Sequence, residues 1–125
     1  MSAQDYREDS RKAIRTLFCI GVRDAFFATD AAERALVIDE SRRAFADLAG
    51  RFGVRVLGTM DDDEVMVGPS TTFPWTAYIL ADIPDYATAA RVCSILRDHP
   101  VGEVRLWHYF TIQARLGRPL FFGNE

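Results

Sequence analysis

The alternation of strand-like and helix-like stretches is the feature that most constrains the fold of this chain. Four stretches are rich in aliphatic and aromatic residues, as β-strands are, and two carry apolar residues at helical spacing. We expect strands at residues 13–22, 54–60, 75–83 and 103–113, and helices at about 30–51 and 86–98. The order is therefore strand, helix, strand, strand, helix, strand.

The two helices are marked by their ends and by one apolar face each. Asp30, with Glu33 three residues later, matches a capping box, and Gly50 and Gly53 can end the first helix. The apolar spacing predicts a buried face made of Ile38, Ser41, Phe45, Leu48 and Phe52. In the second helix, the corresponding residues are Ala89, Val92, Cys93 and Leu96.

This order is that of the ferredoxin-like α+β arrangement, an antiparallel sheet with two helices on one face. The other face carries Trp and Tyr as well as aliphatic residues, which is more apolar surface than monomers usually expose. A second copy of the chain can cover it, so we expect a homodimeric α+β barrel in which the tail at 120–122 docks on the partner. Residues 1–11 are expected to be a disordered lead-in, and 12–125 a single domain.

Composition excludes several classes of function. The net charge of −3, with basic residues spread along the chain, gives no reason to expect a nucleic acid partner. No apolar run approaches the roughly 20 residues that span a bilayer, and residues 1–11 lack a secretory pattern. Cys19 and Cys93 are far apart and are expected to be buried free thiols. A cytoplasmic protein with no membrane partner is the simplest interpretation.

The expected last strand has two unlike faces. Side chains alternate along a strand, so one face is apolar apart from His108. The other face mixes rings with hydrogen-bonding groups: Arg105, Trp107, Tyr109, Thr111 and Gln113. Such a face is typical of a small-molecule pocket or of a dimer interface, and both remain open.

Candidate catalytic residues follow from these faces. His108 can act as a general acid or base; the alternatives are a core or interface histidine and a metal or haem ligand. Tyr78 and Tyr109 can polarise oxygen atoms of a substrate, although Tyr78 can equally pack in the core. His99 lies too far from His108 in the sequence for a histidine-rich metal site, and the acidic run at 61–64 is expected to be a solvated turn.

Candidate substrate-binding residues are aromatic or basic. Trp107 can stack on a ring and Arg105 can hold a carboxylate. Trp75 lies on the face of the third strand opposite Tyr78, and Phe73 lies in a loop that either covers the pocket or only connects two strands. Phosphate-binding loops, nucleophile elbows and CxxC motifs do not occur in the sequence.

Over residues 13–116 the chain resembles the dimeric α+β barrel superfamily, which includes haem-degrading monooxygenases, quinol-forming monooxygenases and muconolactone isomerases. The stretch 58–70, with Phe73-Pro74-Trp75 and Leu80-Ala81-Asp82-Ile83-Pro84, resembles the small IacB-type proteins associated with indole-3-acetate degradation. The resemblance implies a role beside oxygenases that break down an aromatic acid, and it carries over no catalytic residue.

These observations favour a small cytoplasmic enzyme of aromatic-compound catabolism. The expected reactions are proton transfer, isomerisation, elimination or oxygenation of an aromatic or quinone-like molecule, with no cofactor. Two alternatives stay open. One is a non-catalytic ligand-binding or accessory protein for a neighbouring oxygenase, and the other is a haem-binding protein that uses His108.

Overall fold

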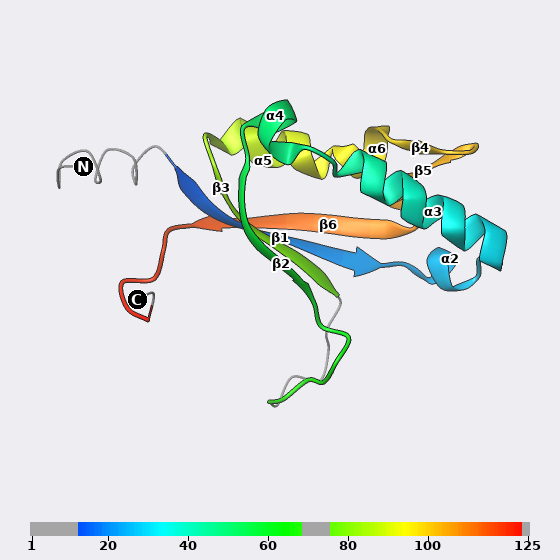
Figure 1. Ribbon diagram of the computed structural model, residues 1–125, viewed down its shortest axis with the longest axis horizontal. Helices are drawn as coiled ribbons and strands as arrows, with labels where there is room; N and C mark the ends of the chain where they lie inside the picture. The colour runs from blue at the N-terminus through cyan, green and yellow to red at the C-terminus, as the bar shows by residue number, and fades with distance from the viewer. Residues whose placement is uncertain (1–12, 69–75, 124–125) are drawn as a thin grey trace.

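The computed structural model describes residues 13–68 and 76–123, and it shows a ferredoxin-like α+β fold (Figure 1). The antiparallel sheet has the order β2-β3-β1-β6, so the first and third strands of the main motif lie at its centre. Its strands are β1 (Ile14–Val22), β2 (Arg55–Asp61), β3 (Ala77–Ile83) and β6 (Phe110–Gly117). The predicted fold class is therefore confirmed. The expected lead-in at 1–11 lies outside the described residues.

The helices lie together on one face of this sheet (Figure 1). They are α3 (Ala31–Ala44), α4 (Leu48–Phe52), α5 (Tyr86–Cys93) and α6 (Ile95–Asp98), preceded by the short α2 (Asp24–Phe27). Asp30 accepts a hydrogen bond from the Glu33 amide at 2.8 Å, as the capping pattern predicts. Gly53 ends α4 with φ +70°, a left-handed conformation that glycine adopts without strain.

Neither helix is continuous over its predicted range. The first is interrupted at Asp47, whose φ of 51° is left-handed and whose carboxylate accepts a bond from the Gly50 amide at 3.0 Å. The second is interrupted at Ser94, whose hydroxyl donates to the carbonyl of Ala90 at 2.8 Å. Such side-chain bonds compete with the helical pattern and bend the chain. Each predicted helix therefore becomes two shorter ones.

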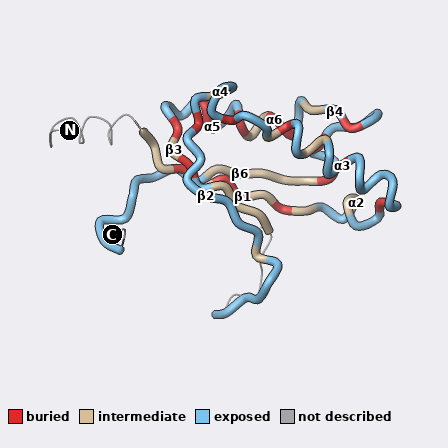
Figure 2. Tube along the Cα trace, viewed as in Figure 1, coloured by how far each residue is buried: buried red, intermediate tan, exposed pale blue. Residues whose placement is uncertain are grey.

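The core lies between the helices and the sheet, where Figure 2 shows the buried segments. Phe18 on β1 is fully buried there, as is Val37 on α3. The predicted face of the first helix is wrong in one position, because Ile38 is 40% exposed and Val37 takes its place. Val37 lies on one face of α3 with Ala44, which is also buried, and a step of one residue turns a helix by about 100°. The second helix buries Ala89, Val92 and Leu96 as predicted, and Cys93 is half-buried.

The predicted strand at 103–113 is also not continuous. It contains β5 (Val104–Arg105), which pairs with β4 (Pro100–Val101), then the 3₁₀ turn η1 (Leu106–His108), and only then β6. Side chains three residues apart lie on the same side of a 3₁₀ turn. Leu106 (0% exposed) and Tyr109 (4%) therefore both enter the core. Strand alternation holds only from Phe110 onward.

Two neighbouring substitutions test the position of the helix stripe. Val37→Ala removes two buried methyl groups and should lower the free energy of unfolding by about 2 kcal/mol. Ile38→Ala, a larger deletion at a half-exposed position, should cost less than about 1 kcal/mol. Urea denaturation of both variants measures the difference, and a larger loss for Ile38→Ala would contradict this packing.

Candidate functional site

The face of the sheet opposite the helices carries a hollow of about 580 Å³. Strand register explains its composition, because Leu17 lies opposite Leu80, and Cys19 and Met60 both lie opposite Tyr78. Its lining is mostly apolar and consists of Leu17, Gly58, Thr59, Met60, Asp62, Tyr78 and Leu80. We call it the sheet hollow.

A hydrogen-bonded pair supplies the polar end of the sheet hollow. The Tyr78 hydroxyl donates to Asp62 Oδ2 at 3.2 Å. Asp62 follows β2, and its backbone amide donates to the carbonyl of Thr76 at 3.0 Å, which holds it beside β3. Burial, followed by the bond to Asp62 and its charge, raises the pKa of Tyr78. The hydroxyl is therefore protonated at neutral pH.

Asp62 is a candidate that the sequence did not reveal. It belongs to the acidic run that was expected to be a solvated turn, and only the pairing of β2 with β3 brings it to Tyr78. The sequence does contain one signal for this contact, because an acidic residue just past one strand of a hairpin lies near the start of the next strand.

Tyr109 is placed away from this hollow. Its ring is buried in the core, and its hydroxyl donates to Glu33 Oε2 on α3 at 2.8 Å. Burial and this bond raise the pKa of Tyr109. The expectation that Tyr109 shares one strand face with Trp107 and Arg105 is wrong, because the 3₁₀ turn rotates Tyr109 inward.

His108, Trp107 and Arg105 do lie together, on a surface separate from the sheet hollow. They line a groove of about 600 Å³ with Arg23, Glu103 and Val104, which we call the Trp107 groove. Trp107 is 53% exposed, and His108 is exposed with its ring edge-on to Tyr109 at 4.9 Å between centroids. A core position for His108 is thus excluded. The roles predicted for Phe73 and Trp75 fall on residues outside the described ranges.

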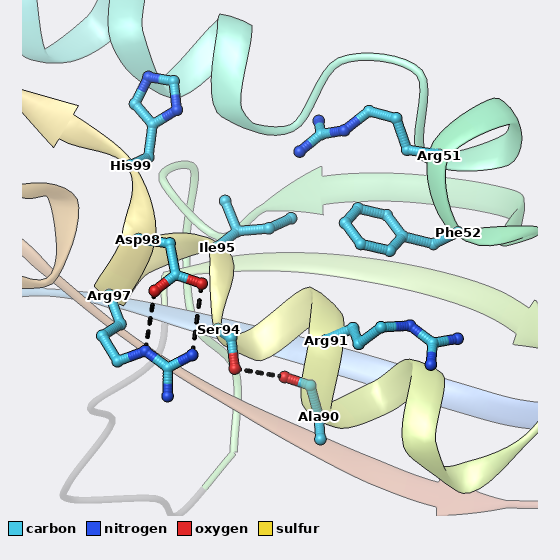
Figure 3. Close-up of a pocket in the computed structure, with 9 residues that line it drawn as sticks. All are labelled: Arg51, Phe52, Ala90, Arg91, Ser94, Ile95, Arg97, Asp98 and His99. Carbon is cyan, nitrogen blue, oxygen red and sulfur yellow. Dashed lines mark hydrogen bonds and ion pairs between the residues drawn. The ribbon is translucent and has the colours of Figure 1, made fainter.

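A further hollow, of about 440 Å³, lies between α4 and the α5–α6 segment (Figure 3). The charged side chains that line this hollow form hydrogen bonds within the chain. Arg51 donates to the carbonyls of Ala44 and Ala46, and Arg97 bonds to both carboxylate oxygens of Asp98. Because the Arg51 bonds join α4 to the end of α3, we interpret this hollow as a structural junction.

His99, at the rim of that hollow, forms a link to α3. Its Nε2 lies 3.0 Å from Glu40 Oε1, and both side chains are largely shielded. The bond to His99 lowers the pKa of Glu40. Glu40 and His99 are 59 positions apart in the sequence, so local patterns do not reveal this contact.

Within 13–68 and 76–123, no three His, Cys, Asp or Glu side chains are grouped so that they could hold a metal ion. Cys19 is buried, Cys93 is half-buried, and both are free thiols. No helix in the same ranges is long and apolar enough to cross a bilayer.

Comparisons with known proteins add little to this geometry. No protein family model and no curated protein sequence matches the chain. It is similar to a dimeric protein of unknown function and ferredoxin-like fold from Bacteroides fragilis NCTC 9343, at 10% identity and TM-score 0.41, over 83% of this chain and 95% of that one. It is also similar to part of the extracellular region of zebrafish Gpr126/Adgrg6, at 15% identity and TM-score 0.35, over 85% of this chain and 13% of that one. Both TM-scores are low, so neither likeness carries an argument about function or assembly.

The bond between Tyr78 and Asp62 predicts a change in titration. Asp62→Asn removes the charge that disfavours the phenolate, so the pKa of Tyr78 should fall toward its ordinary value while burial still holds it above. Titration of ¹³C-labelled tyrosine rings by NMR measures this shift. The control Asp63→Asn, one residue along the same turn, should leave the pKa unchanged. An equal shift in both variants would show that Tyr78 senses only the general charge of the turn.

The bond between Tyr109 and Glu33 predicts an effect on stability. Tyr109→Phe should lower the free energy of unfolding by about 1 kcal/mol, the usual net worth of one hydrogen bond. Because folding raises the pKa of Tyr109, its contribution is complete below the ordinary value of 10.0 and is lost as the pH rises through the folded-state value. Denaturation curves between pH 7 and the alkaline range should therefore converge for the two proteins. Tyr86→Phe, at an exposed ring, is the neutral control.

Proposed function

We propose that the protein is a small enzyme of aromatic-compound catabolism that binds an aromatic or quinone-like molecule in the sheet hollow. The observation that carries the proposal is an apolar hollow with a hydrogen-bonded Tyr–Asp pair at one end. Leu17, Leu80 and Met60 offer a surface for a planar ring, and thioethers pack well against aromatic rings. Pockets that are mostly apolar with a few placed polar groups are typical of small-molecule sites.

The proposed chemistry is proton transfer without a cofactor. Asp62 accepts a proton from a carbon next to a carbonyl group of the ligand. The neutral carboxyl group then accepts hydrogen bonds less well, so Tyr78 redirects its O–H to the oxygen on which negative charge has developed. Return of the proton to another carbon completes an isomerisation. Atoms and electrons balance, because one C–H bond breaks and another forms.

This proposal moves the proton-transfer role away from two residues favoured by the sequence. His108 lines a different hollow from Tyr78, and the Tyr109 hydroxyl is bonded to Glu33 in the core. One small substrate bound in the sheet hollow would contact neither. The resemblance to IacB-type proteins supports indole-3-acetate and its oxidised derivatives as the first compounds to test, and a cytoplasmic location belongs to the same proposal.

A homodimer is part of the proposal because the open face lacks a cover. In the lining of the sheet hollow itself, Met60 is 60% exposed and Leu80 38%. The segment after β2 exposes Val65, Met66 and Val67, and the end of the chain exposes Leu120, Phe121 and Phe122. Both segments extend beyond the sheet on the side away from the helices (Figure 1). A second copy packed here would bury apolar surface and close the hollow to water.

A non-catalytic ligand-binding or accessory protein is the second candidate. It is favoured by the composition of the sheet hollow, whose described lining holds only two titratable groups, Asp62 and Tyr78, and no histidine. These two groups already bond to each other, which is sufficient to orient a ligand without reacting with it.

A ligand screen followed by turnover separates these candidates. Purified protein is tested by thermal shift against indole-3-acetate, its hydroxylated and oxindole derivatives, catechols, quinones and haem. A ligand at a hundredfold excess over Kd stabilises the protein by about 2.7 kcal/mol. If a hit is turned over, Asp62→Asn should reduce the rate by about a hundredfold or more, the usual size of a general-base contribution.

Two controls define the outcome of the turnover assay. Asp63→Asn and His108→Ala should retain the rate, because neither residue lines the sheet hollow. Loss of activity in His108→Ala with full activity in Asp62→Asn would refute the proposed site. Binding without turnover of any hit would favour the accessory protein, and a Soret band upon haem addition that His108→Ala abolishes would favour haem binding.

Matched arginine substitutions test the dimer. Leu80→Arg places a charge on the open face and should give a monomer, whereas Ile38→Arg places it on α3 at nearly the same exposure, 40% against 38%, and should remain a dimer. Size-exclusion chromatography with light scattering measures both masses. A monomeric wild-type protein, or equal behaviour of the two variants, would contradict this interface.

A further inference from the structure

We propose that the Trp107 groove binds a small aromatic anion, at a site separate from the sheet hollow. The inference does not depend on the proposed function, since the two sites share no lining residue. It rests on the shape of the surface around Trp107, on the exposure of the indole and on the charge of Arg23.

Two hollows meet at Trp107 and Arg23. One is the Trp107 groove, and the other is a smaller hollow of about 300 Å³ next to β6 and α6. The apolar part of its lining includes Leu96, Phe110 and Ile112, and the polar part includes Arg97 and Thr111. Trp107 lines both, so a planar group placed here meets the indole and an apolar surface.

The exposure of Trp107 follows from the fold. The 3₁₀ turn η1 directs Leu106 and Tyr109 into the core and leaves Trp107 53% exposed. An exposed indole does not gain the stabilisation that burial of its apolar surface would give. Large aromatic rings of this kind are enriched where small molecules or partners bind. Its backbone is held, because the Tyr109 amide donates to the carbonyl of Leu106 at 2.9 Å.

Arg23 supplies a cation available to a ligand. Its backbone amide donates to the carbonyl of Tyr109 at 2.8 Å, which holds the residue beside η1. Arg97 and Arg105 both bond to Asp98, through its carboxylate and its carbonyl respectively. The Arg23 guanidinium, in contrast, makes no hydrogen bond or ion pair within residues 13–68 and 76–123. A guanidinium presents paired donors that match a carboxylate.

The other polar groups of the Trp107 groove further restrict the kind of ligand that fits it. The His108 ring offers a further hydrogen-bond donor, while Glu103 at the same groove disfavours a second negative charge near it. A ligand with one planar ring system and one carboxylate satisfies this arrangement. The ring packs on Trp107 and the carboxylate pairs with Arg23.

Titration with 2-naphthoate tests the site. In ¹⁵N-labelled protein the indole N–H signal of Trp107, assigned with Trp75→Phe, should shift on binding, and calorimetry gives Kd. The neutral 2-naphthamide should bind wild-type protein at least about tenfold more weakly, because it cannot form the charge-assisted pair. Arg23→Gln should weaken 2-naphthoate binding by a similar factor, whereas Arg42→Gln, the same charge change on α3, should not.

The outcomes are distinguishable from those of the proposed function. Tyr78→Phe should leave the shift of the Trp107 signal unchanged, because Tyr78 lines the sheet hollow and not the Trp107 groove. A Trp107 signal that does not move with 2-naphthoate, or equal affinities for the acid and the amide in wild-type protein, would overturn the inference. The comparison of two ligands on wild-type protein holds even if the Arg23 variant fails to fold.

Discussion

The pairing of β1 with a strand on each side is the constraint on which the rest of the structure depends. Its register places Phe18 opposite Ile79 of β3 and Ala114 of β6, and all three face the helices. Side chains alternate along each strand, so the same register determines the opposite face. There, Leu17 meets Leu80 and Cys19 meets Tyr78. Core and sheet hollow are thus two consequences of one set of backbone hydrogen bonds.

The 3₁₀ turn before β6 is the second constraint on the structure. It interrupts strand alternation where the chain holds its densest group of aromatic residues. Leu106 and Tyr109 complete the core, and the bond from Tyr109 to Glu33 ties the turn to α3. Trp107 and His108 are left on the outside. A continuous strand would have put Trp107 and Tyr109 on one face and joined what are now two separate surfaces.

The two surfaces differ in the chemistry they favour. The sheet hollow has apolar walls and a carboxylate that bonds to a protonated hydroxyl, which suits proton movement on a neutral ring. The Trp107 groove is open to solvent and is lined by both a guanidinium and an indole, which suits recognition of an aromatic anion. In a solvent-exposed groove an ion pair is worth about a tenfold change in affinity, so the ring contact is expected to supply the rest.

The sequence by itself determined the order of elements, the ferredoxin-like topology, the Asp30 cap and the buried residues of the second helix. These follow from local hydrophobic periodicity and from hydrogen bonds between near neighbours. Alternation along the predicted third strand also places Tyr78 and Leu80 on one face, since β3 is a regular strand. Tertiary structure alone decided the contacts of Asp62 with Tyr78, Glu33 with Tyr109 and Glu40 with His99, which join residues 16, 76 and 59 positions apart. It also decided the 3₁₀ turn, because Leu106 and Tyr109 can both be buried only when the backbone leaves the strand conformation, and local sequence does not record where the core will lie.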